Sequence, residues 1–368
     1  MASRQRISKQ NLDSASTAID LFSGCGGLTL GLKRAHFKVV AAVEKDPVAI
    51  ETYRVNHPEV CVWETDIQDL AAANIRRGLK LRPGQLDLLA ACPPCQAFSS
   101  IRTRNGAQIV RDPTKNLVFE ILRFARALRP KSVMLENVPR LAKDKRFAAV
   151  CAALRRMGYA CEFRIVNAAD HGVPQRRRRL ILVANRLGRV AFAKPSASQK
   201  TVRQAFKGLR APRSSADSLH KVTETRSLAV KERIRHIPAD GGSRSDAGYR
   251  FRLKCHRQFD GFKDVYGRMS WDDVSPTITS GCVNPSKGRF LHPDRNRTIT
   301  LREAAILQGF PRRYFISQAA GKFRAAALIG NAIPPELVRR QANTINGLIH
   351  NPDGSAARPG PARQHAKH

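Results

Sequence analysis

Residues 17–35, "TAIDLFSGCGGLTLGLKRA", predict a short buried strand, a glycine turn and a helix. Gly24, Gly26 and Gly27 lie in the turn, where the missing side chains let the backbone approach a ligand closely. The helix that follows presents free backbone N–H groups at its first turn. A glycine turn alone is weak evidence, because dinucleotide enzymes begin in the same way. The stretch therefore predicts an α/β nucleotide-binding fold without identifying the nucleotide.

The alternation of strand and helix continues beyond this unit as far as residue 186. The strand-like runs are "FKVVAAVEKD" (37–46), "CVWETDI" (61–67), "QLDLLAACPPC" (85–95), "KSVMLENVP" (131–139), "YACEFRIVNAAD" (159–170) and "RRRLILVANR" (177–186). Most of them are separated by segments with apolar residues at helical spacing, such as "PTKNLVFEILRFARALRP" (113–130). This order predicts an α/β fold, a mostly parallel Rossmann-like sheet flanked by helices.

Two carboxylates follow consecutive strands at the edge where a nucleotide would bind. Glu44 lies 20 residues beyond Gly24, at the end of the second strand, where it can accept hydrogen bonds from two ribose hydroxyls. Asp66 ends the third strand, within reach of an adenine amino group. The set indicates an adenosine-type ligand, but by itself it does not separate NAD from S-adenosylmethionine.

The chain is strongly basic, with 65 Lys and Arg against 29 Asp and Glu, a formal net charge of +36 and a pI near 11.1. A polyanionic partner would relieve this self-repulsion, so nucleic acid is the expected ligand. Residues 186–268 alone hold 20 Lys and Arg against 7 Asp and Glu, and they show little periodicity. We expect this basic region to contact phosphates and base edges.

These patterns divide the chain into five parts. We expect a disordered segment (1–17), an α/β nucleotide-binding domain (18–185), a smaller basic domain (186–268), a segment in which regular helices resume (269–349) and a disordered tail (350–368). No apolar run of about 18 residues occurs, so no membrane span is expected. The cysteines in apolar strand-like runs suit a reducing cytoplasm rather than a disulfide framework.

The stretch "ACPPCQAFSS" (91–100) allows three interpretations of Cys92 and Cys95: a redox dithiol, half of a metal site, or one nucleophile. No second Cys pair or His cluster accompanies them, so no metal site is expected. The next strand end carries Glu136. Arg177 and Arg179 share one face of the last strand-like run, given its alternation. A thiol, a carboxylic acid and two guanidinium groups around an adenosine pocket suit covalent chemistry on a base.

At this point the chain resembles the bacterial-type DNA (cytosine-5)-methyltransferase family. The resemblance rests on "DLFSGCGGL", "EKD", "TDI", "PPCQAFS", "ENV", "QRRRR", "RTITLREAAILQGFP" and "GNAIPP", which occur in the family's order. It covers about residues 18–185 and 266–348, and leaves out 186–265, which corresponds to the family's variable target-recognition region. The resemblance implies that 18–185 is the S-adenosylmethionine-binding catalytic domain, that 186–268 is the target-recognition domain, and that 269–349 returns to the catalytic domain. The family usually has Gly at the position of Cys92, and we expect that only a small residue is required there.

The resemblance implies site residues in three groups. The catalytic group is Cys95, Glu136, Arg177 and Arg179, and Gln96 and Ser99 contact DNA from a mobile loop. Residues expected at S-adenosylmethionine, besides those derived above, are Phe22, Ile67, Pro94, Leu117, Asn331 and Ile333.

The chemistry implied is nucleophilic catalysis on an extruded cytosine. Cys95 attacks C6, a protonated Glu136 neutralises N3, and the two arginines hold the base and the surroundings of the thiolate. The expected function is methylation of a short sequence in double-stranded DNA, within a restriction-modification system or as a solitary methylase.

Several alternatives stay open at this stage. A transfer RNA cytosine-5 methyltransferase and a catalytically inactive DNA-binding protein share the motifs, and an NAD oxidoreductase shares the glycine turn. We expect a cytoplasmic, nucleoid-associated monomer, whose cognate endonuclease, if present, forms no stable complex with it.

Overall fold

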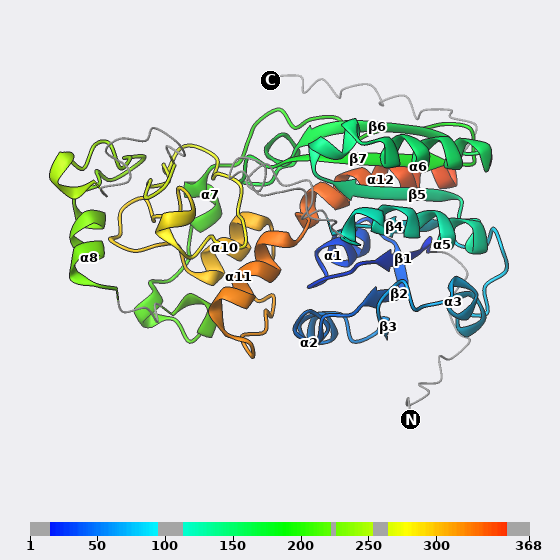
Figure 1. Cartoon of the computed structure of the whole chain (residues 1–368), viewed down its shortest axis with the longest axis horizontal. Helices are drawn as coiled ribbons and strands as arrows, with labels where there is room; N and C mark the ends of the chain where they lie inside the picture. Colours follow the sequence, from blue (N-terminus) through cyan, green and yellow to red (C-terminus); the bar gives the residue numbers. More distant parts are fainter. Residues whose placement is uncertain (1–14, 95–112, 222–225, 253–263, 352–368) are drawn as a thin grey trace, which may run out of the picture.

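A seven-stranded sheet organises the N-terminal half of the computed structural model, which describes residues 15–94, 113–221, 226–252 and 264–351. The strands lie in the order β3-β2-β1-β4-β5-β7-β6 (Figure 1). Their bounds are β1 Thr17–Leu21, β2 Lys38–Glu44, β3 Cys61–Glu64, β4 Leu88–Ala91, β5 Ser132–Asn137, β6 Ala160–Asn167 and β7 Arg178–Asn185. All seven lie within the runs expected from the sequence. The first five are parallel, and β7 runs antiparallel to both β5 and β6.

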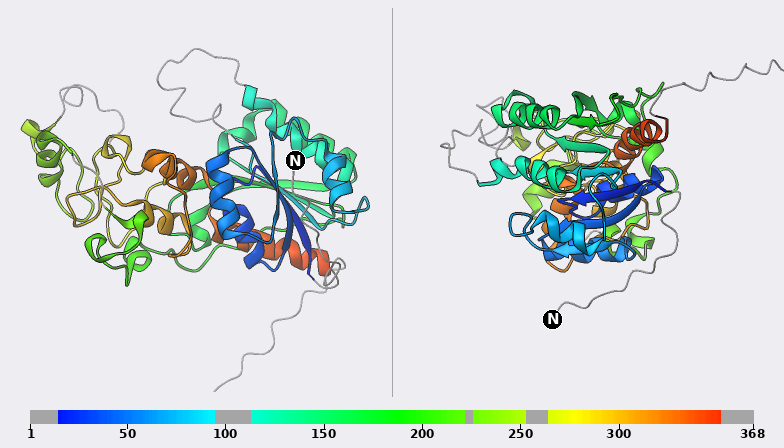
Figure 2. Two further views of the ribbon diagram at one scale, coloured as in Figure 1. Left: turned by 90° about the horizontal axis from the view of Figure 1, so that it is seen from below. Right: turned by 90° about the vertical axis from the view of Figure 1, so that its right-hand side faces the viewer.

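Two layers of helices cover the sheet, because alternate residues of each strand are apolar on both faces (Figure 2). One face packs against α3 (Ala72–Gly78), α5 (Glu120–Leu128) and α6 (Lys145–Arg156). The other face packs against α1 (Gly27–Arg34), α2 (Pro47–Asn56) and α12 (Pro335–His350). The mostly parallel sheet flanked by helices is confirmed.

Helix α12 closes the fold by returning from the far end of the chain to α1. Its Leu337 and Val338 are buried in one core with Leu28 and Leu32 of α1. Gly31 permits this contact, because a Cβ atom there would lie 2.4 Å from Val338 Cβ. Helix α12 therefore packs as part of the sheet region.

A second part of the molecule lies beyond one end of the sheet (Figure 1). Its helices are α7 (Val202–Phe206), α8 (Leu228–Arg235), α10 (Leu301–Gln308) and α11 (Gly321–Asn331). Helix α10 has sharp ends: Thr300 and Glu303 form a capping box at its start, and Gly309 ends it at φ 97°. The described residues between 186 and 300 contain no strand of this sheet, which agrees with their lack of periodicity.

One hydrophobic core joins the two segments that the sequence analysis assigned to different domains. Val202, Phe206 and Leu219 pack in the same cluster as Ile278 and Leu301. The recognition segment and the first part of the returning segment thus fold together. The exact domain boundaries stay a prediction. Within the described residues, no helix is long and apolar enough to cross a membrane.

Candidate active site

Backbone conformation and close packing explain the glycines in the turn after β1. Gly24 and Gly26 have φ values of 53° and 89°, which L-residues rarely adopt. A Cβ atom at Gly26 would lie 2.6 Å from both His57 Nε2 and Tyr314 Oη, while one at Gly24 would meet nothing within 4 Å. Gly26 is therefore enclosed by protein, and Gly24 borders open space where a ligand can approach the backbone.

Glu44 at the end of β2 holds this turn in place. Its Oε2 accepts a hydrogen bond from the Gly24 N–H at 2.8 Å, and its Oε1 accepts from the N–H groups of Lys45 and Asp46, each at 2.9 Å. Oε2 has one lone pair left, so it can accept a further hydrogen bond from a ligand hydroxyl group. The structure thus links Glu44 directly to the glycine turn, a contact that the sequence did not predict.

Asp66 lies just past β3 and forms an ion pair with Lys45, 2.7 Å between Oδ2 and Nζ. The hydrogen bond from Lys45 lowers the pKa of Asp66, and the Gln68 N–H adds to this effect. Ile67 and Leu117 are buried in one core, with Phe22 packed against it. Phe22, Ile67 and Leu117 thus belong to the core on one face of the sheet, and their contact with a cofactor stays a prediction.

The C-terminal segment reaches the glycine turn from the other side. A Cβ atom at Gly27 would lie 2.6 Å from the Ile333 carbonyl oxygen, so that segment touches the start of α1. Ile333 is buried, whereas Asn331 is exposed. Ile333 thus lies at the glycine turn, and the roles of Asn331 and Ile333 at a cofactor stay predictions.

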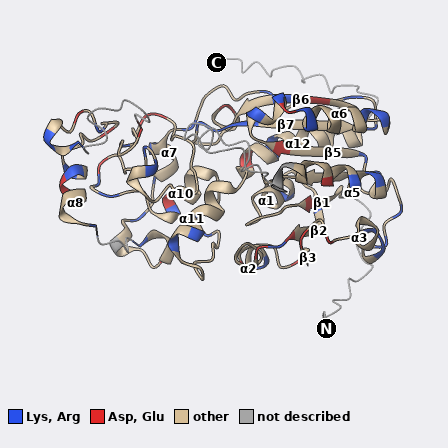
Figure 3. Ribbon diagram, in the orientation of Figure 1, with Lys and Arg blue, Asp and Glu red and all other residues tan. Residues whose placement is uncertain are grey.

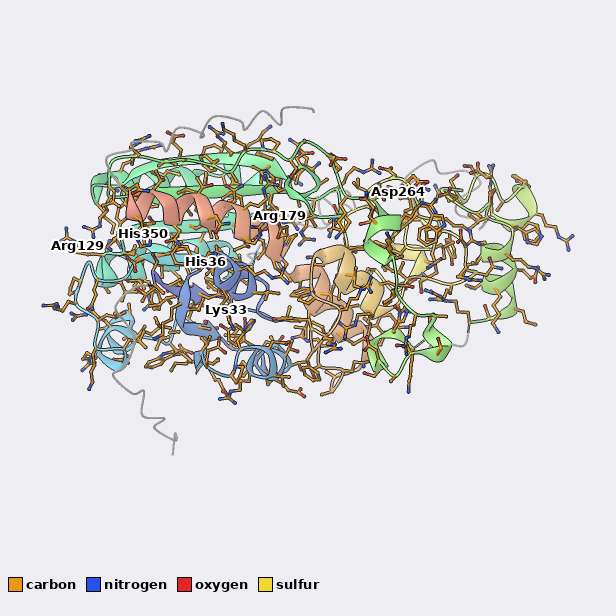
Figure 4. The ribbon with its side chains drawn as sticks, turned by 180° about the vertical axis from the view of Figure 1, so that it is seen from behind. Lys33, His36, Arg129, Arg179, Asp264 and His350 are labelled. Carbon is orange, nitrogen blue, oxygen red and sulfur yellow. The ribbon has the colours of Figure 1, made fainter. Side chains whose placement is uncertain are left out.

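Glu136 and Arg179 form an ion pair at the ends of β5 and β7. Arg179 Nε lies 2.8 Å from Glu136 Oε1, and the two side chains are only 14% and 11% exposed. Arg179 lies at the end of the sheet that faces the second part of the molecule (Figure 4). The Asn137 side-chain amide donates to the Pro93 carbonyl at 3.2 Å and so joins the end of β5 to the segment after β4. A paired carboxyl group and a guanidinium thus stand at the strand ends.

Arg177 has different contacts from Arg179. Its guanidinium donates to the carbonyl oxygens of Ile278 (2.8 Å), Gly330 (2.9 Å) and Ala332 (3.1 Å), and the residue is 3% exposed. These bonds tie the start of β7 to both segments that flank the site. The sequence placed Arg177 and Arg179 on one face of the strand, but it did not predict that Arg177 donates to backbone carbonyls of other segments.

Three of the predicted residues, Cys95, Gln96 and Ser99, lie outside the described residues, so their roles stay predictions. Pro94, expected at the cofactor, is described and is exposed. Among the described residues, no group of His, Cys, Asp and Glu could hold a metal ion, and the described cysteines are free.

Two features on this face of the sheet were not foreseen from the sequence: the burial of Asp20 and the raised pKa of the Cys92 thiol. Asp20 on β1 is fully buried, and its Oδ2 accepts a hydrogen bond from the Thr29 hydroxyl at 2.7 Å. Burial raises the pKa of Asp20 to about 7. Burial, together with the neighbouring Glu136, raises the pKa of the Cys92 thiol well above its usual value. Strand alternation, which places Asp20 and the residues after β4 on one face, was the signal available in the sequence.

The basic region, residues 186–268, contains both exposed and buried cations. Figure 3 shows Lys and Arg along α8 and the segments next to it. Arg268 is 2% exposed, and its guanidinium donates to backbone carbonyls that include those of Ile234 (2.9 Å) and Ile237 (2.9 Å). Such a residue supports the fold and does not face a phosphate. Arg203 pairs with Asp272, 2.7 Å between Nε and Oδ1.

Comparison with known proteins agrees with this arrangement. The family model for C-5 cytosine-specific DNA methylases matches residues 16–347. The type II methylase M.HgiDII of Herpetosiphon aurantiacus is 35% identical over 352 residues, 90% of this chain and 95% of that protein. The type II methyltransferase M1.HphI of Haemophilus parahaemolyticus is 32% identical, over 89% of this chain and 86% of that protein.

Solved structures show the same fold. A candidate DNA modification methyltransferase encoded within an Escherichia coli prophage aligns with a TM-score of 0.69 at 24% identity, over 91% of this chain and all of that one. The Dnmt2 methyltransferase of Schizosaccharomyces pombe aligns with a TM-score of 0.56 at 18% identity, over 92% of this chain and 99% of that one.

Proposed function

Because this chain belongs to the C-5 cytosine-specific DNA methylase family, we propose that Cys95, Glu136 and Arg179 carry its reaction. The protein is a methyltransferase that uses S-adenosylmethionine to methylate cytosine C5 in double-stranded DNA. The observation that supports this assignment of residues is the ion pair of Glu136 and Arg179 at the strand ends, beside the segment that leads to Cys95.

The residues at the glycine turn fit the cofactor. Gly24 borders open space, and the carboxylates of Glu44 and Asp66 end neighbouring strands at the same edge. We expect Glu44 to bind the ribose hydroxyls, Asp66 the adenine amino group, and Asn331 to complete the pocket from the C-terminal side. Bound S-adenosylmethionine supplies the methyl group.

The side chains of this protein supply covalent and acid catalysis. The Cys95 thiolate forms a bond to C6 of cytosine, and the electron pair of the C5–C6 double bond makes C5 nucleophilic. A protonated Glu136 gives its proton to N3 and so neutralises the charge that develops there. After C5 has gained the methyl group, water or a base removes the C5 proton, and the Cys95–C6 bond breaks to release the thiolate.

The two arginines have separate tasks in this proposal. Arg179 holds the Glu136 carboxyl group and adds positive charge beside the base. Arg177, which donates to three backbone carbonyls, positions the flanking segments and does not itself contact the cytosine.

Binding of the duplex is assigned to the exposed cations of the basic region, together with Gln96 and Ser99. Phosphate contacts would give affinity, and contacts with base edges would give specificity for a short sequence. The target base must leave the helix, because C5 is not accessible to the thiol and the methyl donor inside the stack. Arg268 is excluded from this set, since it is buried.

A transfer assay with tritium in the methyl group tests this proposal against its alternatives. We expect label in duplex DNA and none in transfer RNA, followed by bisulfite sequencing that finds one short methylated sequence. Label in transfer RNA alone would favour an RNA substrate. Binding of duplex DNA without label in either would favour an inactive DNA-binding protein.

The cellular role is proposed from the relatives. Both of those named above are type II enzymes, which supports a place in a restriction-modification system or descent from one. We propose that the protein acts as a cytoplasmic monomer, apart from any cognate endonuclease. Sedimentation of the protein alone and mixed with such an endonuclease would test this.

A further inference from the structure

The strand register places Cys92 beside Glu136. In the parallel pair of β4 and β5, Ala91 is the partner of Leu135, so the next residues along the two strands are Cys92 and Glu136. The Cys92 N–H continues the strand pairing by donating to the Leu21 carbonyl at 3.2 Å. Paired residues in neighbouring parallel strands point to the same face of the sheet. Cys92 and Glu136 therefore share one face at the strand ends.

Contacts around the carboxyl group agree with this placement. Burial raises the pKa of the Cys92 thiol most, the neighbouring Glu136 raises it further, and the side chain packs against the core beneath α1 and α12. Arg179 contacts the same carboxyl group from β7 at 2.8 Å. The buried Asp20 lies on this face as well and raises the pKa of the Cys92 thiol further, so the thiol keeps its proton at neutral pH.

We propose that Cys92 is a positioning residue for Glu136: its S–H group donates to the Glu136 carboxyl group and, with Arg179, fixes that group at the strand end. This inference rests on the proposed role of Glu136 and departs from the sequence-based expectation that a small residue suffices at position 92. It assigns the two cysteines of the Cys-Pro-Pro-Cys stretch different tasks. Cys95 reacts with the base, and Cys92 orients the acid.

Two substitutions separate this role from simple packing. Cys92→Ala removes the donor and retains a small apolar side chain, while Cys92→Ser restores a donor in the same place. Because a thiol is a weak donor, we expect kcat of Cys92→Ala to fall by about five- to tenfold, with unchanged KM for the cofactor and for DNA. Cys92→Ser should recover most of this loss.

The pH profile of kcat provides a readout that packing would not change. Removing a donor to a carboxylate disfavours its ionised form. The alkaline limb of the profile should therefore move to higher pH in Cys92→Ala and return in Cys92→Ser. Cys61→Ala and Cys61→Ser are matched controls, because Cys61 is a partly buried thiol on β3, at the far edge of the sheet. Both should match the wild type.

The experiment includes Glu136→Gln and thermal melting of every variant. If Glu136→Gln is inactive while Cys92→Ala keeps the kcat and pH profile of the wild type, the positioning role is wrong and the proposed function stands. Equal losses in Cys92→Ala and Cys92→Ser, with or without a lowered melting temperature, would show a packing role and also overturn it. Full activity of Glu136→Gln would instead overturn the proposed function.

Discussion

The strand-end site (Glu136, Arg177 and Arg179) and the basic region use charge in opposite ways. In the strand-end site, the charged groups are few and mostly buried, and each has a defined partner: Glu136 pairs with Arg179, and Arg177 donates to backbone carbonyls. In the basic region, 20 Lys and Arg stand against 7 Asp and Glu, and many of them are exposed. Buried charges act individually because water does not screen them, whereas exposed charges act through their number.

This difference predicts a gradient of mutational effects. A single substitution in the strand-end site should have a large effect on activity or stability, and a single substitution on the surface of the basic region should have a small one. Position in the sequence does not predict the effect for Arg268, because this residue belongs to the basic region yet is as buried as Arg177. Burial and partner, not position in the chain, should set the size of each effect.

Glu136→Gln should give the largest effect. The amide keeps the shape but cannot give a proton to N3, so kcat should fall by about 10²- to 10⁴-fold with little change in KM for DNA. Single-turnover methylation of a duplex measures this. Glu162→Gln is the control, since Glu162 is exposed on β6. Turnover within tenfold of the wild type would show that Glu136 is not the acid.

Arg177→Met should destabilise the fold strongly. Buried carbonyl oxygens of residues 278, 330 and 332 would lose their donor, so the free energy of unfolding should fall by about 3 to 5 kcal/mol. Arg176→Met is the matched control in the same arginine run, because Arg176 forms only an exposed pair with Asp273 that is worth about 1 kcal/mol or less. Equal effects in urea unfolding would contradict the comparison.

Asp20→Asn should change how stability depends on pH. The folded pKa is about 7 and the usual value is 3.8, so the folded state holds the proton more tightly than the unfolded state. Stability is therefore lost as pH rises from about 4 to 7. Between pH 5 and pH 8 the wild type should lose about 3 kcal/mol relative to Asp20→Asn, from the energy of one pKa unit. Parallel urea curves at both pH values would refute this.

Single changes on the surface of the basic region should have the smallest effect. Lys231→Ala or Arg250→Ala removes one exposed cation. Where that cation contacts a phosphate, affinity for DNA should fall by about threefold, and the slope of log affinity against log salt should decrease by about one. A titration at several NaCl concentrations measures both. Loss of methylation at saturating DNA would show that these residues act in the strand-end site instead.

The sheet region was predictable because its signals are local. The strand, glycine turn and helix of residues 17–35 need only their own sequence, and alternation along each strand defines two buried faces. Glu44 and Glu136 could be placed because parallel strands end at one edge. Helix α3 was missed, since "AANIRRG" is short and carries few apolar residues.

The second part of the molecule was less predictable for a physical reason. Arg177 looks like a member of the charged run 176–179, and Arg268 looks like one more cation of the basic region. Their guanidinium groups nevertheless donate to carbonyls of segments distant in sequence. The placement of Cys92 beside Glu136 likewise depends on the register of β4 against β5. Such partners arise from tertiary structure, which the composition of a stretch does not reveal.

Covalent capture of a modified duplex tests the central claim most directly. A duplex with 5-fluorocytosine at the methylated position cannot lose a proton from C5, so the bond from Cys95 to C6 should not be released after methyl transfer. We predict a complex that survives denaturation, requires S-adenosylmethionine and is absent in Cys95→Ser. A wild-type protein that methylates ordinary duplex DNA yet forms no such complex would contradict the account.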